Sequence, residues 1–431
     1  MNKRKVVSLL TVAAMSTALL AGCGGGSTSS GNKTSSGTST AKTDSKGTSI
    51  AVFNSKMEIQ SQMEEMAKKY SEEKGVDVEV YYSSDTVAAH LSTRYASNDP
   101  YTISMVDAKD VYSLAKEHAI DLSDQDFVKD TTQAIAIDGK TYGFPVCVEA
   151  RGIIYNADAI KKATGADFDP TTVKTTADLQ AIAEKCGTGI MKEDWSLAAH
   201  FLAEVYEQHD DPDAFIAGIK DDSVKLAEDP KFVAMMDTFD VLKANNYAKD
   251  AAISAEREVT EQKLAEGEIG MMFGGNWDWS VINAYDYSEN MGIMPVPNDV
   301  GDGSSDKLVG GGSKYFFIDS SDNTSDDQRK AAKDFLNWLV YDEEGQKFIV
   351  EDCALVPAFS NIKLEVKDPL GASVKKYADA DALIPNYNYL PDDHYAKCGA
   401  IFQKYLADKI DRAEFAKEIT EYWSTAEVGA H

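Results

Sequence analysis

Two hydrophobic periods alternate along the first part of the folded chain. Residues 49–56 (SIAVFNSK) read as a strand followed by a loop, and residues 76–82 (VDVEVYY) alternate apolar and polar positions as a second strand. Between them lies a helix that ends at Gly75. The apolar face of that helix consists of Ile59, Met63, Met66 and Tyr70. A helix around residues 85–96 then leads to a third strand, YTISMVD, which ends at Asp107. This alternation predicts a parallel α/β sheet.

The ends of these strands are the first indication of a binding site. Ligands of open α/β sheets bind beyond the carboxyl ends of the strands. Residues 54–58 and Asp107 both lie at such ends.

Helices dominate the middle of the chain, and strand and helix return after it. Helical patterns cover residues 176–186, 195–208, 229–244, 257–266 and 327–350, and a strand is predicted over 308–319. Trp338 and Trp423 fall beside the apolar faces of late helices, and we expect both to pack in the core. Residues 299–306 (DVGDGSSD) are dense in carboxylates, but their spacing departs from an EF-hand and the downstream Glu is missing. We therefore predict a solvated turn there and no metal site.

The N-terminus has the layout of a secretory signal. A basic start is followed by an apolar stretch from Val6 to Leu20 that is short for a membrane span. The segment ends in LLAGC, which resembles the lipobox of bacterial lipoproteins, so residues 1–22 are predicted to be cleaved and Cys23 to carry lipid. An ordinary signal peptide with a chance cysteine is the alternative. Lipid on Cys23 would hold the protein on a membrane face.

Composition sets further limits on partners. Residues 23–47 are mostly Gly, Ser and Thr, so we expect a flexible tether. The net charge is −28, and it becomes −31 when the three basic residues of the signal are removed. Nucleic acid is therefore not an expected partner. Cys147, Cys186, Cys353 and Cys398 are widely spaced, and the sequence leaves disulfides and buried free thiols equally open.

No catalytic motif stands out. The six histidines are scattered singly, without a His-Glu-x-x-His, a Gly-x-Ser-x-Gly or a phosphate-binding glycine loop. Paired carboxylates that hydrolyse glycosides remain open, because 71 acidic residues offer many pairs. We expect a protein that is not an enzyme and needs no cofactor.

One short stretch, MMFGGNWDWS (271–280), holds two of the five tryptophans with Asp278 between them. Core packing is the simple interpretation of both indoles. The alternative is that one indole is a flat platform for a ligand that also binds carboxylates. A sugar ring fits this description, since an indole covers its C–H face and carboxylates accept hydrogen bonds from its hydroxyl rim. We assign Trp277 and Asp278 to the ligand and Trp279 to the core.

Five stretches together resemble the carbohydrate-binding extracellular solute-binding proteins of ABC importers, and among them the maltodextrin-binding type. They are DGKTYGFPVCVEARGIIYN (138–156), LAEGEIGMMFGGNWDW (264–279), MGIMPVPND (291–299), LVGGGSKYFFI (308–318) and AAKDFLNWLVYDEEGQKFIVEDCALVPAF (331–359). The likeness covers 48–431. No single motif is diagnostic, and the order of all five is what carries it.

The resemblance implies a two-lobe periplasmic-binding-protein-like α/β fold with discontinuous lobes, a hinge and a ligand cleft between the lobes. Lobe one would be 48–148 with 309–361, and lobe two would be 152–304 with 365–431. Such proteins close round the ligand by hinge motion.

The resemblance also nominates ligand-binding residues. Glu149 and Trp277 fall where the family binds sugar hydroxyls and stacks a sugar ring, Asp107 matches a strand-end acid, and Trp195 and Tyr387 fall near further aromatic contacts. Tyr389 lies close to Tyr387, and Lys56 and Glu58 lie where the first loop would reach the ligand. Arg151 and Val106 depart from the pattern, where an apolar residue and an aromatic residue are expected.

The sequence therefore predicts a monomeric, lipid-anchored receptor on the extracellular face of the cell membrane. It would capture an oligosaccharide and hand it to an ABC permease. Maltooligosaccharide is the first candidate ligand, followed by other gluco- or galacto-oligosaccharides. The rival interpretation is a surface-anchored glycoside hydrolase or a passive polysaccharide-binding lipoprotein.

Overall fold

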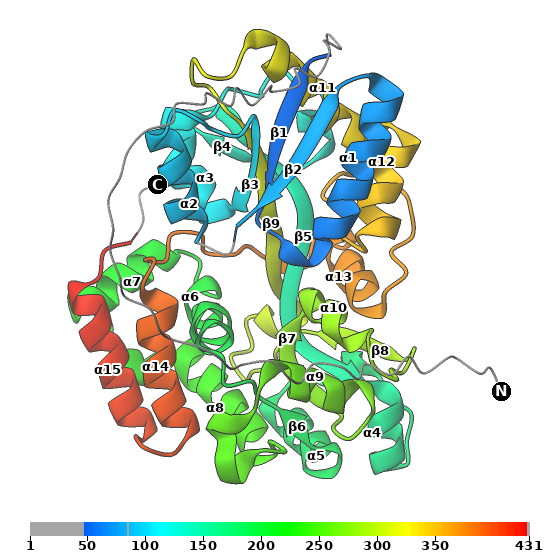
Figure 1. Cartoon of the computed structure of the whole chain (residues 1–431). Helices are drawn as coiled ribbons and strands as arrows, with labels where there is room; N and C mark the ends of the chain where they lie inside the picture. The colour runs from blue at the N-terminus through cyan, green and yellow to red at the C-terminus, as the bar shows by residue number, and fades with distance from the viewer. Residues whose placement is uncertain (1–46, 84–85, 429–431) are drawn as a thin grey trace, which may run out of the picture. The chain divides into compact units, whose positions relative to one another are not determined.

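Two long strands run between the two ends of one mixed sheet in the computed structural model (Figure 1). The structure describes residues 47–83 and 86–428, so the predicted signal peptide, Cys23 and most of the tether lie outside the described residues. The strands are β1 (Ser49–Asn54), β2 (Asp77–Tyr82), β3 (Ile103–Asp107), β4 (Ile135–Ile137), β5 (Lys140–Asn156), β6 (Thr188–Gly189), β7 (Met271–Gly275), β8 (Met291–Met294), β9 (Leu308–Ile318) and β10 (Leu383–Ile384).

The order of the strands explains why the sheet is mixed. The path runs β2-β1-β3-β9-β5-β7-β6, with β10 beside β9 and with β4 and β8 beside β5. The first three strands are parallel, as predicted, whereas β9 is antiparallel to β3 and β5 is antiparallel to β9 and β7. The prediction of a parallel sheet is therefore wrong for the strands that β5 and β9 join, although β6 with β7 and β10 with β9 are again parallel pairs.

Helices surround the strands at both ends of the sheet, which is the predicted two-lobe arrangement (Figure 1). In one lobe β1, β2 and β3 lie among α1, α2, α3 and α11, and in the other β6, β7 and β8 lie among helices from α4 to α10. The helices are α1 (Gln60–Lys74), α2 (Val87–Ala96), α3 (Ala108–His118), α4 (Ala157–Thr164), α5 (Thr176–Cys186), α6 (Ala203–Glu207), α7 (Pro212–Lys220), α8 (Pro230–Ala244), α9 (Arg257–Ala265), α10 (Trp279–Ile282), α11 (Asp326–Tyr341), α12 (Glu343–Lys347), α13 (Pro369–Asp379), α14 (His394–Leu406) and α15 (Arg412–Thr425). Two π-helices, η4 (Trp195–Leu202) and η9 (Phe348–Asp352), continue into or out of neighbouring helices, and the single turn η7 (Asn276–Asp278) follows β7.

The helical patterns read from the sequence are confirmed. The predicted apolar face of α1 is buried, and Gly75 ends the helix with a left-handed φ of 70°. Trp338 and Trp423 are both buried in the core, as expected. In α3 the Asp107 carboxylate and the Asp110 carboxylate form a reciprocal capping box, which fixes the start of this helix at the end of β3.

Three further observations concern the cysteines, possible metal ligands and apolar helices of the described residues. Cys147, Cys186, Cys353 and Cys398 are all buried free thiols. Within residues 47–83 and 86–428, no group of three or more His, Cys, Asp or Glu side chains is arranged to hold a metal ion. No helix in this part of the chain has the length and apolar character needed to cross a membrane.

Candidate functional site

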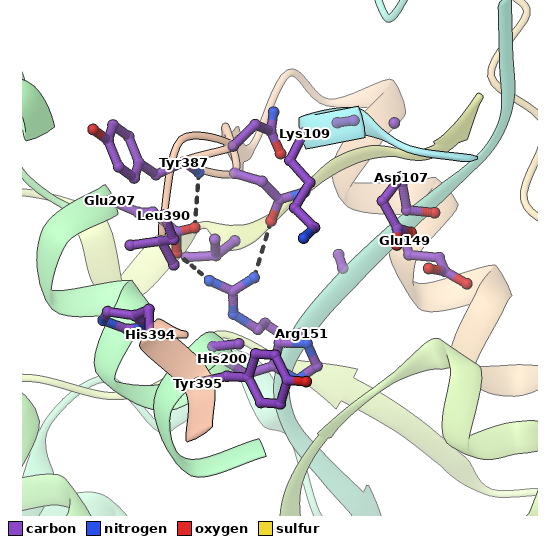
Figure 2. A pocket seen from close by; sticks show the side chains of 18 of the residues that line it. Asp107, Lys109, Glu149, Arg151, His200, Glu207, Tyr387, Leu390, His394 and Tyr395 are labelled. Atoms are coloured by element: carbon purple, nitrogen blue, oxygen red, sulfur yellow. Dashed lines mark hydrogen bonds and ion pairs between the residues drawn. The ribbon is translucent and has the colours of Figure 1, made fainter. Parts of the chain in front are cut away.

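A cavity of about 400 Å³ lies between two groups of elements (Figure 2). The carboxyl end of β3 and the middle of β5 line one part of it, and η4, α6 and the segment after β10 line the other. Charged and aromatic side chains from distant parts of the chain line it. They are Asp107, Lys109, Glu149, Arg151, His200, Glu207, Trp277, Tyr387, Asp392, His394 and Tyr395. Asp107, Glu149, Arg151, Trp277 and Tyr387 are thus brought together in one cavity. Lys56, Glu58, Trp195 and Asp278 are not among its lining residues.

Lys56 lies behind the cavity and holds Glu149 in place. Its ammonium group donates to Glu149 and to Glu58, each at 2.7 Å. Lys56 is 5% exposed, whereas Glu58 is 40% exposed and lies on the surface side. Burial alone would raise the pKa of Glu149, but the adjacent Lys56 ammonium outweighs it and lowers that pKa. Glu149 therefore enters the cavity as a carboxylate whose charge is already balanced.

Asp107 has a similar partner in β9. Lys314 donates to the Asp107 carboxylate across the antiparallel β3–β9 pair. The Lys314 ammonium is buried, which by itself lowers its pKa, but Asp107 and Glu149 raise it further than burial lowers it. Asp110, one turn along α3, has its pKa raised to about 6 by burial and by the nearby Asp107. The charged wall at this edge of the sheet is therefore made of ion pairs.

Arg151 is the centre of a buried network on the opposite wall (Figure 2). It pairs with Val309 of β9 and Gly275 of β7, at the point where β5 passes between the two ends of the sheet. Its guanidinium group donates to Glu207 and, at 2.9 Å, to the side-chain oxygen of Asn386. The departure from the family pattern at position 151 is thus matched by two carboxylates on α6, Glu204 and Glu207.

Glu204 and Glu207 differ in their hydrogen-bond partners, and burial raises the pKa of both. Glu207 also accepts a hydrogen bond from the backbone N–H of Tyr387 at 2.9 Å. Glu204 lies 3.5 Å from the Arg151 Nε. Burial raises the pKa of Glu204 to about 8, because Arg151 opposes this only in part and Glu207 adds to it. The network therefore ties β5, α6 and the segment after β10 together with one carboxyl group that is neutral near pH 7.

Trp277 lines the cavity at the start of the turn that follows β7. A Cβ atom at Gly275 would lie 2.3–2.5 Å from three adjacent carbons of the indole. Those near-equal distances place Gly275 against the face of the ring rather than its edge. The φ of Gly275 is −143°, an ordinary extended value, so the position requires glycine for room and not for conformation. The imidazole of His200 lies 4.7 Å from the indole on a tilt of 47°.

Asp278 and Trp279 belong to the support of this turn. The Asp278 carboxylate is fully buried, accepts the N–H of Gly275 at 3.0 Å and pairs with Arg257 at 3.0 Å. Trp279 is 9% exposed and packs edge-on against Tyr287 with ring centroids 4.8 Å apart. The acid between the two indoles therefore fixes the turn that presents Trp277, and it does so from behind the cavity.

Tyr387 and Trp195 also act at the edges of the site. The Tyr387 hydroxyl donates to Asp213 at 2.5 Å, and Tyr387, which is 9% exposed, is among the lining residues of the cavity. Tyr389 lies outside the lining, where its ring meets that of Tyr112 at 4.8 Å. Trp195 contacts His200, with ring centroids 5.3 Å apart, and lies behind it.

Several polar atoms at the cavity find no hydrogen-bond partner among the described residues. They are the Nε of Arg151, the Nδ1 of His200, the Nε1 of Trp277 and the Nδ1 of His394. Buried polar atoms without partners are uncommon in folded proteins. These four atoms belong to residues that line the cavity, but each atom is itself buried, and similar atoms occur elsewhere in the described residues.

The sequence interpretation missed His200, Glu204 and Glu207. They recur at spacings of four and three on a helix whose other residues are mostly apolar. That polar stripe was a usable signal, because a helix buried on most sides has little reason to carry it. Lys314 and Asn386 carry no comparable local pattern, since each reaches the site through a partner far away in the sequence.

Solved structures share this fold along nearly the whole chain. A RafE solute-binding protein in complex with raffinose matches with a TM-score of 0.72 and 19% identity, covering 87% of this chain and 98% of the other. A family 1 extracellular solute-binding protein from Bifidobacterium longum subsp. infantis matches with a TM-score of 0.64 and 22% identity, covering 88% and 100%. A sugar transporter from Bacillus licheniformis in complex with stachyose matches with a TM-score of 0.64 and 18% identity, covering 87% and 99%.

The sequence itself places the chain in a family. Residues 65–382 match the family described as bacterial extracellular solute-binding protein, and this match spans most of the chain. Its members bind solutes and are not enzymes, and the name places them outside the cell. The chain therefore belongs to the bacterial extracellular solute-binding proteins, with the two-lobe fold that the sequence predicted.

Proposed function

We propose that the protein captures a short, uncharged oligosaccharide in the cavity and delivers it to the permease of an ABC importer. The observation that carries this proposal is the composition of the cavity wall. The wall combines the indole of Trp277 with carboxylates that are already paired, Glu149 with Lys56 and Asp107 with Lys314. An indole face suits the C–H face of a sugar, and carboxylates and amides suit its hydroxyl groups.

The pairing of charges favours a neutral ligand. Glu149 is balanced by Lys56, Asp107 by Lys314, and Arg151 by Glu207. An ion pair can still accept or donate hydrogen bonds to hydroxyl groups, whereas an added ligand charge would remain unbalanced in a partly dry site. We therefore expect neutral sugars to bind more tightly than uronates or amino sugars of the same length.

The residues proposed to contact the sugar are those that line the cavity. They are Asp107, Glu149, Arg151, Trp277 and Tyr387. The other nominated residues would act from behind. Lys56, which also binds Glu58, would hold Glu149. Asp278 would hold the turn that carries Trp277, and Trp195 would support His200.

The sugars bound by two neighbours in fold support a proposal for the ligand class. Raffinose and stachyose, bound in the structures described above, are galactosyl-sucrose sugars, and the sequence favoured maltooligosaccharides. We propose gluco- and galacto-oligosaccharides of this size as the ligand class, with Val106 in place of an aromatic residue arguing for fewer stacked rings than in maltodextrin binders.

The proposal includes an anchor at the N-terminus. Lipid at Cys23 and the tether up to residue 47 would keep the receptor beside its permease, and we propose that the receptor is a monomer.

The proposal also includes the boundaries of the two lobes. Lobe one would comprise 48–148 and 309–361, and lobe two 152–304 and 365–431. A crossing between the lobes at 149–151 would place Glu149 and Arg151 on the hinge strand. A ligand that binds these two side chains would then contact the hinge directly.

A titration panel tests the function directly. Raffinose, stachyose, maltotriose, maltotetraose and trigalacturonate would be titrated calorimetrically and by thermal shift. We expect saturable binding of at least one neutral sugar, and a ligand at 100 times its dissociation constant should add about 2.7 kcal/mol to the stability. Trigalacturonate as the tightest ligand would overturn the neutral class, and binding of none of these sugars would overturn the oligosaccharide proposal.

The anchor is tested separately. The full chain expressed in a bacterium should partition into detergent, whereas Cys23→Ala should be released as a soluble protein. Equal membrane association of the two would remove the anchor from the proposal.

A further inference from the structure

The helix that opens with Trp195 has an unusual turn. Between Trp195 and Leu202 it is a π-helix, and the N–H of Ala203 donates to the carbonyl of Ala198, five residues earlier. In an α-helix of about 3.6 residues per turn, side chains five apart point about 140° away from each other. In a π-helix the hydrogen bonds join residues five apart, so such residues lie one above the other.

This geometry brings together two aromatic side chains that an α-helix would separate. Trp195 and His200 are five residues apart, and their rings meet edge to face with centroids 5.3 Å apart and an angle of 75°. His200 then contacts Trp277, which lies in a different part of the chain, at 4.7 Å. The three rings form a continuous cluster, and we call Trp195, His200 and Trp277 the ring cluster.

The ring cluster occupies the wall of the cavity. His200 and Trp277 both line the cavity, and Trp195 packs behind His200 with the guanidinium of Arg257 5.6 Å from its ring centroid. Gly275 lies against one face of the Trp277 indole, and the imidazole of His200 lies 4.7 Å from the indole, ring centroid to ring centroid, at an angle of 47°. The indole therefore contacts two parts of the protein before any ligand binds.

The imidazole at the centre is uncharged. Burial lowers the pKa of His200 well below its ordinary value, and the nearby Arg151 and Arg257 lower it further. A neutral ring can rest against an indole without needing a counter-ion in the cavity. Its Nδ1 has no hydrogen-bond partner among the described residues, and neither does the Nε1 of Trp277.

We propose that the π-helical turn serves to build the ring cluster, and that His200 is a positioning residue that orients Trp277 as the platform for the ligand. The inference rests on the proposed function. π-turns inside α-helices frequently occur at functional sites. Here the widened turn has a specific result, because in an α-helical turn position 200 would point about 140° away from Trp195.

Three substitutions in the full chain separate orientation from simple packing. His200→Ala removes the ring, His200→Phe keeps a ring of similar size without nitrogens, and Trp277→Ala removes the platform. Far-UV circular dichroism and thermal melts first establish that each variant is folded. Affinity is then measured by calorimetry for raffinose, stachyose, maltotriose and maltotetraose.

We expect His200→Ala to weaken binding of the best sugar about tenfold, the size of effect that one lost aromatic contact produces. His200→Phe should recover most of this loss, since the ring support is restored. In the Trp277→Ala background, His200→Ala should have little further effect. Near-UV circular dichroism of the ligand-free protein should change in His200→Ala, because the indole of Trp277 loses its neighbour, and should return towards wild type in His200→Phe.

The outcomes distinguish this inference from the proposed function. If Trp277→Ala weakens binding and His200→Ala does not, the positioning role is wrong while the sugar site stands. If the two losses simply add in the double variant, His200 acts independently of Trp277 and the inference is also wrong. If Trp277→Ala binds the sugar normally, the platform itself fails. An unchanged near-UV spectrum in His200→Ala would overturn the ring cluster even if none of the sugars binds.

Discussion

Trp277 and Trp279 are two residues apart, yet their surroundings differ completely. Trp277 lines the cavity, and Trp279 packs into the core with 9% of its surface exposed. Between them Asp278 turns inward and accepts the N–H of Gly275. Successive side chains of this short helical turn point in different directions, so the two tryptophans have different surroundings and different roles.

The two indoles should accordingly fail in different ways. Trp277→Ala should fold normally and lose about 100 Å² of stacked contact, or about 2.5 kcal/mol, which corresponds to roughly 60-fold weaker binding of the sugar. Trp279→Ala should cost about 3–5 kcal/mol of stability through the cavity it leaves. Calorimetric titration and thermal melts on both variants measure this. Normal binding by Trp277→Ala together with a folded, non-binding Trp279→Ala would reverse the assignment.

Glu204 provides a test of the buried network through pH. Its pKa in the folded protein is raised to about 8 from the ordinary value of 4.5 for a glutamate, chiefly by burial. The folded protein therefore holds a proton that the unfolded chain releases between these two values. The associated stability is fully present below about pH 4.5 and is lost as the pH rises towards 8, by up to about 1.4 kcal/mol per pH unit.

Replacing this one group should flatten that dependence. Glu204→Gln mimics the protonated form, so the variant should match wild type near pH 4.5 and become progressively more stable than wild type up to pH 8. Denaturant unfolding at several pH values measures the free energy of unfolding of both proteins. In the difference between variant and wild type, the contributions of the other acidic residues cancel. Parallel stability curves for the two proteins would show that Glu204 ionises normally.

At the scale of elements, the sequence predicted most of what local periodicity controls. The apolar stripe of α1, its glycine stop and the helices α5, α8 and α9 follow from patterns within a few residues of each other. Two features could not be predicted from local periodicity. The antiparallel pairing of β5 and β9 joins residues more than 150 positions apart. The π-turn of η4 departs from the α-helical period of about 3.6 residues that the sequence prediction assumes.

The candidate site divides along the same line. Cavity positions such as Glu149 and Trp277 were identified from a family resemblance, while Lys314 and Asn386 depend on long-range partners that no local pattern contains. Asp278 shows the limit most clearly. Its neighbours in sequence suggested a ligand contact, but the turn points its carboxylate into the protein, where Arg257 and a backbone N–H bind it.

The close approach of β5 and β9 gives an element-scale prediction. A Cβ at Gly310 would lie 2.5 Å from the carbonyl oxygen of Glu149 and 2.4 Å from the Cβ of Ala150, neither of which can move without shifting the strand. At Gly311 the nearest atoms are the side-chain ends of Gln133 at 3.1 Å and Asn386 at 3.9 Å. Glycine is therefore required at one position and only convenient at the next.

Alanine should separate these neighbours. Gly310→Ala should destabilise the protein by about 1–3 kcal/mol through overpacking between the two strands. Gly311→Ala, the matched control in the same strand, should change stability by much less, because Gln133 and Asn386 can give way. Equal losses of stability in the two variants, measured by denaturant unfolding, would contradict this prediction. Close packing of β5 on β9 would then not be the reason that position 310 is glycine.

At the scale of the whole molecule, the cavity is assembled from both lobes. Asp107 and Lys109 come from the end of β3 and the start of α3, whereas His200 and Trp277 come from the elements at the other end of the sheet. Only β5 and β9 of the long strands pass between these groups. A ligand that contacts both walls gains interactions when they approach, and it can shift the equilibrium only by that difference in affinity.

Ligand binding should therefore bring the lobes together by hinge motion. The experiment uses the protein without residues 1–22 and the sugar identified by titration. Small-angle scattering should give a smaller radius of gyration with a saturating amount of this sugar than without it. Trp277→Ala at the same sugar concentration is the control, since it retains the fold but loses one wall of the site and should close less. The decrease should also track the binding isotherm as sugar is added. A radius that stays constant while calorimetry reports saturation would mean that the sugar binds without closure, and the hinge at 149–151 would then have no role in ligand capture.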